Sequence, residues 1–194
     1  TLTELDLAKN TLVIFTSDNG GFWKATSNAP LRANKGAYYE GGIRVPLIIK
    51  WPGVAGQGIV VHTPSTSSDL YPTCLHAADM KLLPNQHQDG VDLTPLLDGK
   101  GRIKERALFW HYPHYNGHPS SVPSSVIRKG NWKLIQTYDP VGVELYNLER
   151  DLSEKRDLSK QEIDLTARLL NELEAWKVSV RAETMIPNQD YKAP

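Results

Sequence analysis

The sequence has little of three features that would narrow its class: cysteine, an excess of one charge, and long hydrophobic runs. Its 194 residues include one cysteine, Cys74, which excludes an intrachain disulfide and leaves the redox compartment open. Basic and acidic residues balance at 22 each, so nothing favours a nucleic acid or an anionic membrane as a partner. No apolar run approaches the roughly 20 residues that span a bilayer. The hydrophobic content of 40% is still enough for a folded core.

The most informative stretch is an apolar run that breaks abruptly into polar residues. Residues 12–15 are apolar at every position, which predicts a strand buried on both faces of a parallel sheet. After Thr16 come Ser17, Asp18, Asn19 and two glycines. Residues just past the carboxyl end of such a strand line the ligand crevice, and the oxygens of Asp18 and Asn19 suit Ca²⁺ or Mg²⁺. The alternative is a simple turn, since the same residues tolerate positive φ.

A second motif follows at close spacing. Residues 31–46 read LRANKGAYYEGGIRVP, and Trp51-Pro52-Gly53 comes after the next apolar run. Together with Ser17-Asp18-Asn19-Gly20, these motifs resemble the sulfatases, the formylglycine-dependent sulfuric ester hydrolases of the alkaline phosphatase superfamily. The resemblance implies an α/β fold: the C-terminal part of a sulfatase-type α/β/α sheet, followed by a small α+β subdomain with an antiparallel sheet and one long helix.

The resemblance also assigns roles to residues of the two motifs. In sulfatases the aspartate and asparagine after this strand complete the metal shell, which implies that Asp18 and Asn19 bind Ca²⁺, with Mg²⁺ as a possibility. The lysine before glycine contacts the sulfate and the leaving oxygen, a role that falls on Lys35. A flexible point charge suits a sulfate oxygen and can also donate a proton. For Glu40 and Arg44 we predict a supporting role, in which they lock the loop by pairing with each other or with backbone.

Two elements of the sulfatase pattern are absent from the sequence. It contains no Asp-Asp pair, and Cys74 does not lie in a Cys-x-Pro-x-Arg segment, the site of the formylglycine nucleophile. We therefore expect the C-terminal portion of a sulfatase, inactive alone, with formylglycine only in a missing N-terminal portion. The expected partners are that portion and a sulfated small molecule or glycan, with no nucleic acid and no membrane span. The resemblance suggests a periplasmic, secreted or lysosomal location.

The remaining sequence predicts two parts, residues 1–104 from the large domain and residues 105–194 as the small subdomain. In the first part, residues 68–78 predict a packing helix with Cys74 and Leu75 in the core, and residues 59–61 predict an edge strand. His76 has no partner that the sequence identifies.

The second part is predicted to begin with a strand over residues 107–115 that ends in aromatic and imidazole groups. His111 and His114 could hydrogen-bond a sulfate oxygen or a substrate hydroxyl, and aromatic packing is the equally weighted alternative. Residues 125–129 and 132–137 predict a hairpin through Gly130-Asn131, and residues 143–147 predict another strand. A helix follows from residue 163 to 180, with a capping box at Ser159 and Glu162.

Two other functions remain open on the sequence alone. The chain could be a non-catalytic module that recognises a sulfated sugar or an acidic partner without hydrolysis. It could also belong to a related phosphatase or phosphonate hydrolase, although Lys35 within its motif favours sulfate.

Overall fold

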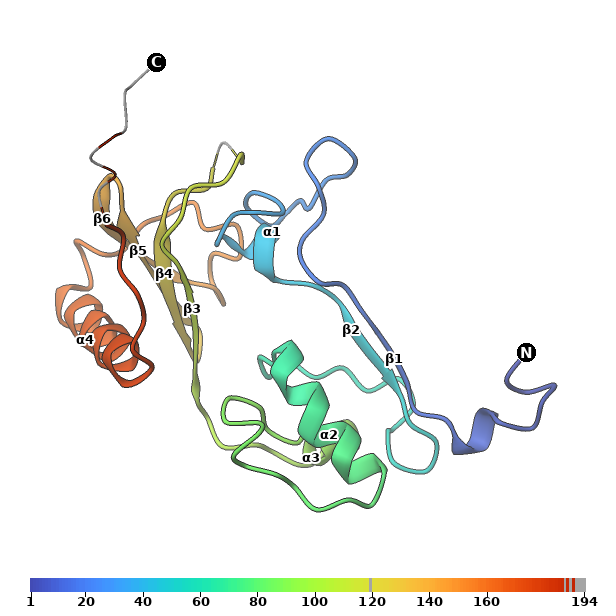
Figure 1. Cartoon of the computed structure of the whole chain (residues 1–194). Helices are drawn as coiled ribbons and strands as arrows, with labels where there is room; N and C mark the ends of the chain where they lie inside the picture. The colour runs from blue at the N-terminus through green and yellow to red at the C-terminus, as the bar shows by residue number, and fades with distance from the viewer. Residues whose placement is uncertain (119, 187, 189, 191–194) are drawn as a thin grey trace. The chain divides into compact units, whose positions relative to one another are not determined.

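The computed structural model describes residues 1–118, 120–186, 188 and 190 and divides the chain into two compact units. Unit 1 consists of Thr1–Ser17 and Pro46–Glu105, and unit 2 of Asp18–Val45 with the chain from Arg106 onward (Figure 1). Each unit therefore combines segments that are far apart in sequence. The predicted division into residues 1–104 and 105–194 stays a prediction.

Unit 1 contains a two-stranded sheet of β1 (Val13–Thr16) and β2 (Leu47–Lys50). The two strands are antiparallel, with Ile14 opposite Ile49. The prediction of a parallel strand buried on both faces is wrong for the described chain, because β1 pairs antiparallel and Phe15 is 60% exposed. An apolar run predicts that a strand is suited to burial, but it does not predict which other segment of the protein covers the strand.

The helical part of unit 1 comprises a 3-10 turn η1 (Ala8–Asn10), a second turn η2 (Ser67–Asp69) that leads into α2 (Leu70–Ala77), and the short helix α3 (Thr94–Leu97). Two buried polar side chains hold the segment before α3 against α2. The Asp69 carboxylate accepts the Val91 backbone N–H at 2.9 Å, and the Thr73 hydroxyl accepts the Leu93 N–H at 2.9 Å. Residues 69–73 therefore form a packing element, and two of their side chains hydrogen-bond to the backbone of the segment before α3.

Two local predictions for unit 1 are wrong, those for Cys74 and for residues 59–61. Leu75 is buried as predicted, but Cys74 is exposed, because successive residues of a helix point about 100° apart. His76 does have a partner, since its Nδ1 lies 2.6 Å from Asp92 Oδ2. Residues 59–61 form no strand.

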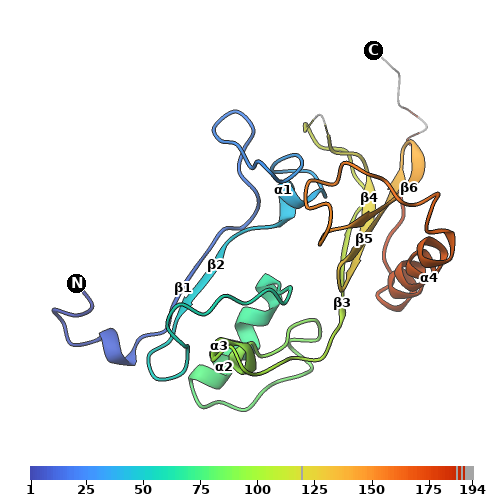
Figure 2. The same cartoon turned by 180° about the vertical axis from the view of Figure 1, so that it is seen from behind.

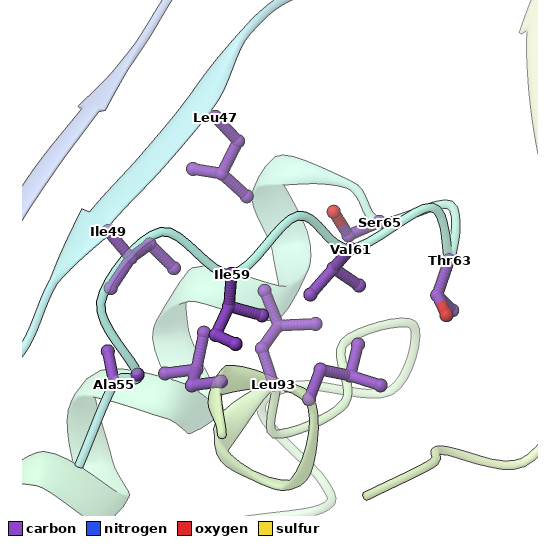
Figure 3. A pocket seen from close by; sticks show the side chains of 11 residues that line it. Leu47, Ile49, Ala55, Ile59, Val61, Thr63, Ser65 and Leu93 are labelled. Atoms are coloured by element: carbon purple, nitrogen blue, oxygen red, sulfur yellow. The ribbon is translucent and has the colours of Figure 1, made fainter. Parts of the chain in front are cut away.

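Ile59 and Val61 instead line an apolar pocket of about 150 Å³, together with side chains of β2 and of the region around α3 (Figure 3). Leu47, Ile49 and Leu93 are among the other lining residues, and the polar side chains in the lining are Thr63 and Ser65. The lining contains no acidic, basic or imidazole group, so this pocket offers no group for acid–base chemistry.

Unit 2 is built on a four-stranded antiparallel meander in the order β3-β4-β5-β6. Its strands are β3 (Ala107–Tyr112), β4 (Ser124–Lys129), β5 (Trp132–Tyr138) and β6 (Val141–Asn147). The predicted hairpin is confirmed, with Gly130 at a φ of +55° in the turn between β4 and β5. The antiparallel sheet with one long helix, and the mixed α/β class, are confirmed.

One face of this sheet is covered by the long helix α4 (Ile163–Ser179), as both views show (Figures 1 and 2). Leu169 and Leu173 of α4 are buried against Ile127, Leu134 and Leu145 of the strands. Trp176 stacks on Phe109 with ring centroids 4.7 Å apart. The predicted capping box does not form, because the Ser159 hydroxyl donates to Asp157 and the N-cap residue Glu162 makes no side-chain capping bond.

Asp157 predicts how the stability of unit 2 depends on pH. Its Oδ1 accepts the backbone N–H of Leu145 on β6 and of Ser159, at 3.0 and 2.8 Å. Desolvation alone would raise the pKa of Asp157, but these hydrogen bonds outweigh it and lower the pKa. The stabilisation is therefore present above the unfolded-state pKa of about 3.9 and is lost as pH falls through the lower folded-state pKa.

We expect the urea midpoint to fall as pH is lowered from 6 towards 3, and to fall less in Asp157→Asn. The asparagine keeps an oxygen acceptor without a charge, so its own midpoint at pH 6 is expected to be lower. Equal pH dependence of the two proteins would contradict this assignment.

Candidate functional site

The two sequence motifs meet in unit 2 through backbone hydrogen bonds. The Gly20 N–H donates to the Gly42 carbonyl at 2.9 Å, and the Lys35 N–H donates to the Gly21 carbonyl at 3.1 Å. The Asn28 side chain fixes the same residue from the other side, accepting the Gly21 N–H at 3.0 Å and donating to the Gly21 carbonyl at 3.1 Å. The segment that carries Asp18 and Asn19 is thus bonded directly to the loop that carries Lys35.

Glycine makes this close approach possible. A Cβ added to Gly20 would lie 1.8 Å from the Gly41 carbonyl oxygen, and one added to Gly42 would lie 1.9 Å from the Ala37 oxygen. Both contacts are with backbone, which cannot rotate away as a side chain could. The glycines of both motifs therefore serve to pack one loop against the other.

Lys35 itself is exposed, while the backbone on both sides of it is held. Gly36 adopts a φ of +96°, and its carbonyl accepts a hydrogen bond from Asn116 Nδ2 at 2.9 Å. Asn116 also donates to the Ser121 hydroxyl at 2.6 Å. An exposed ammonium group on a backbone that is held in place is well suited to contact an anion in a defined position.

The helix α1 (Glu40–Ile43) fastens the Lys35 loop to the meander through a buried ion cluster. Lys133 on β5 is fully buried and places its ammonium 3.0 Å from Glu40 Oε1 and 2.9 Å from Glu154 Oε1. Glu154 also accepts the Glu40 backbone N–H at 2.6 Å. Arg128 and Arg44 lie 3.7 and 3.5 Å from Glu40 Oε2. Glu40 and Arg44 do pair with each other, and their supporting role in the site stays a prediction.

A second contact between the loop and the meander is aromatic. The Arg32 guanidinium lies 3.6 Å from the Tyr39 ring centroid and donates to the Tyr146 hydroxyl at 2.9 Å. Both tyrosine hydroxyls donate to Glu144, at 2.9 Å from Tyr39 and 2.7 Å from Tyr146. Burial, and then the neighbouring Glu144 carboxylate, raise the pKa of Tyr39. The tyrosines are therefore neutral donors at physiological pH and serve to anchor the loop.

The two predicted substrate histidines differ in their surroundings. His111 on β3 is engaged within unit 2: Nδ1 lies 2.6 Å from the Ser125 hydroxyl, and Nε2 lies 2.7 Å from the Glu183 carbonyl. Because a carbonyl only accepts, Nε2 carries a proton. His114 is exposed and packs edge-on against Tyr112, with centroids 5.1 Å apart. Substrate binding by either histidine stays a prediction, and His114 has the more accessible ring.

Asp18 and Asn19 offer one carboxylate and one amide oxygen, which fit a hard divalent cation. Asp18 is exposed and Asn19 is half-buried. Two donors are fewer than the six to eight oxygens that Ca²⁺ takes. Within the described ranges, no group of three or more His, Cys, Asp or Glu side chains is placed to hold a metal. These two residues could therefore form part of a Ca²⁺ shell, and their binding of a metal stays a prediction.

Comparison with known protein families identifies the family of this chain. The model of the N-sulphoglucosamine sulphohydrolase C-terminal family matches residues 33–179. The chain belongs to this sulfatase family. The match contains Lys35, Glu40, Lys133 and Glu154, and hence residues 33–46 of the second sequence motif and the ion cluster that anchors it.

Individual sulfatases are also similar. A sulfatase of Formosa agariphila is 41% identical over 196 residues, which covers 93% of this chain and 35% of the relative. Human arylsulfatase A is 41% identical over 134 residues, covering 67% of this chain and 25% of that enzyme. The chain thus spans about a third or less of the length of these relatives.

Solved structures give the same result. The structure of Ps i-CgsB in complex with k-i-k-neocarrahexaose has a TM-score of 0.79 and 34% identity, covering 90% of this chain and 38% of that one. A protein solved with its substrate D-glucosamine-2-N,6-O-disulfate has a TM-score of 0.72 at 24% identity, which shows the shared fold. In the part of this sulfatase chain that the structure describes, no helix is long and apolar enough to cross a membrane.

Proposed function

We propose that this chain is the C-terminal part of a sulfatase that hydrolyses sulfate esters of carbohydrate, and that it supplies Lys35, Asp18 and Asn19 to a composite active site. The observation that carries the proposal is the pair of backbone bonds that hold the Asp18 segment against the Lys35 loop. These bonds join the segment that carries Asp18 and Asn19 to the loop that carries Lys35, although the two are separated in sequence. The similarity to a protein solved with neocarrahexaose supports an oligosaccharide substrate.

Lys35 has the clearest chemical role. Hydrolysis of a sulfate ester moves negative charge towards the leaving oxygen, and a positioned cation stabilises that charge most where water is excluded. The exposed Lys35 ammonium can contact a sulfuryl oxygen and donate a proton to the leaving oxygen. Its backbone is held by Gly21, and the following residue is held by Asn116.

The metal and the nucleophile complete the proposal. Asp18 and Asn19 would contribute oxygens to a Ca²⁺ or Mg²⁺ ion, which when bound supplies positive charge at the sulfate. The nucleophile, a formylglycine, would come from the N-terminal portion of the enzyme, so the isolated chain is proposed to be inactive. His114 would contact the sugar or the sulfate, whereas His111 could do so only after giving up one of its ring-nitrogen contacts, with Ser125 or with the Glu183 carbonyl.

Metal removal tests this arrangement in the full sulfatase that contains the chain. We expect sulfate release from a sulfated oligosaccharide to stop after chelation and to return with Ca²⁺. Ca²⁺ is also expected to raise the melting temperature of the wild type and to have much less effect on Asp18→Ala. The matched control is Asp6→Ala, a substitution in the exposed N-terminal segment of unit 1.

Three results would contradict the proposal. Sulfate release that survives chelation, or an equal Ca²⁺ shift in Asp18→Ala and the wild type, would exclude the metal role. Release of phosphate but not of sulfate from matched sugar esters would place the enzyme among the related phosphatases.

A further inference from the structure

The loop that follows the Asp18 segment carries two exposed aromatic side chains and a cation. We call residues 22–27 the aromatic loop. Phe22 and Trp23 are 47% and 48% exposed, and their ring centroids lie 5.9 Å apart. Lys24 places its ammonium 5.0 Å from the Trp23 ring centroid. The two rings and the ammonium therefore form one exposed surface that is both aromatic and cationic.

The turn itself is ordered by its own hydrogen bonds. The N–H groups of Ala25 and Thr26 both donate to the Phe22 carbonyl, at 2.9 and 3.0 Å. Asn28 closes the base of the loop by bonding both polar backbone atoms of Gly21. The backbone that carries the two aromatic rings is thus held by hydrogen bonds.

The position of this scaffold connects it to the proposed active site. The Gly21 carbonyl that accepts the Lys35 N–H is two residues before Trp23, so the Cα atoms of Gly21 and Trp23 lie within about 7 Å of each other. Asn19 lies only two residues before Gly21 on the other side. The aromatic loop therefore directly follows the segment that is hydrogen-bonded to the Lys35 loop.

The chemistry of the aromatic loop matches a sulfated sugar. A pyranose ring presents a face of C–H groups that an exposed indole can cover, removing apolar area of both partners from water. A lysine beside that indole suits a sulfate or carboxylate on the same sugar. A neutral ligand would leave Lys24 without a counter-charge, and a purely apolar ligand would bury it.

We propose that the aromatic loop is a subsite for a second, anionic sugar ring, next to the ring whose sulfate ester is hydrolysed. Trp23 stacks on this ring, with Phe22 beside it, and Lys24 pairs with its sulfate. The subsite makes the enzyme selective for sulfated oligosaccharides over sulfated monosaccharides. This inference rests on the proposed function, because it needs a sulfate ester held at Lys35.

The test compares two substrates in the full sulfatase: a disulfated oligosaccharide and the corresponding sulfated monosaccharide. In Trp23→Ala we expect kcat/KM for the oligosaccharide to fall about 10- to 100-fold, mostly through KM, with the monosaccharide unchanged. Trp23→Tyr is expected to restore most of the loss. Lys24→Ala is expected to reduce the preference for the disulfated over a monosulfated oligosaccharide, and Lys24→Arg to retain it.

Val141→Ala serves as the matched control, because Val141 is an 89% exposed apolar residue of β6 outside the motifs. Loss of activity towards both substrates in Trp23→Ala, with a lower melting temperature, would overturn the inference and place the indole in an internal packing contact. Unchanged kinetics with both substrates would overturn it as well. A wild type that hydrolyses neither ester would overturn the proposed function itself, a result distinct from selective failure of the subsite.

Discussion

Replacing Lys133 by methionine is expected to lower the free energy of unfolding of the chain by about 3–5 kcal/mol, the cost of breaking a buried ion pair by removing one partner. Lys133 is fully buried, and its ammonium is shared by the carboxylates of Glu40 and Glu154. Methionine preserves much of the volume and removes the charge. Two buried carboxylates then face each other without the cation between them.

The pH dependence of this variant distinguishes charge burial from a packing defect. Burial already raises the pKa of Glu154, against the opposing effect of Lys133. Without Lys133 that pKa rises further, so the folded state of Lys133→Met takes up protons more readily than the unfolded state. The variant is therefore expected to gain stability as pH is lowered from 8 towards 5.

Lys129→Met is the matched control for urea unfolding. Lys129 lies on the same sheet and pairs with Glu172 at 2.8 Å, but its side chain is 44% exposed. An exposed pair contributes about 0–1 kcal/mol, so this variant should unfold close to the wild-type midpoint. Similar small losses in both variants, or a Lys133→Met loss that does not change with pH, would contradict the role given to the cluster.

Replacing Lys35 by alanine in the full sulfatase is expected to lower kcat about 10²- to 10³-fold, which is the usual effect of removing one positioned donor from developing negative charge. The loss should appear in kcat more than in KM, because the proposed contact strengthens as charge moves to the leaving oxygen. A substrate with a better leaving group should lose less, since it needs less protonation.

Two variants, one at Lys35 and one in unit 1, control this measurement. Lys35→Arg keeps a charge but cannot readily release a proton, so it is expected to retain substrate binding and to recover little of the kcat. Lys9→Ala removes an exposed lysine in unit 1 and should leave the kinetics unchanged. A Lys35→Ala enzyme with a normal kcat would remove Lys35 from the catalytic group, whatever its effect on stability.

Short sequence patterns predicted those parts of the fold that depend on residues close together in the chain. The Gly130-Asn131 dipeptide determined the hairpin, since its turn needs a residue with positive φ. The helical spacing of Leu169, Leu173 and Trp176 predicted the face of α4 that packs on the sheet. The Glu40–Arg44 pair was predictable in the same way, because the two residues are four apart.

The contacts that join distant segments could not be predicted in this way. Lys133 is 93 residues from Glu40, and nothing in the sequence near Lys133 identifies its partner. The signal that was available is periodicity, since Lys133 shares a face of β5 with the buried Ile135. A lysine on an inward-facing position is a candidate for a buried ion pair. The exposure of Phe15 on β1 could not be predicted for a related reason. Whether a side chain on a strand is buried depends on which other segments pack against that strand.

The most direct test of the composite site measures sulfate released from a sulfated oligosaccharide in the presence of Ca²⁺. Three samples are compared: this chain alone, the N-terminal portion of the enzyme alone, and the two produced together. We predict release only when both are present, because the proposed site takes its nucleophile from the N-terminal portion and Lys35 from this chain. Equal release by the chain alone would contradict the composite site. Binding of the oligosaccharide without release by the combined portions would instead identify a recognition module.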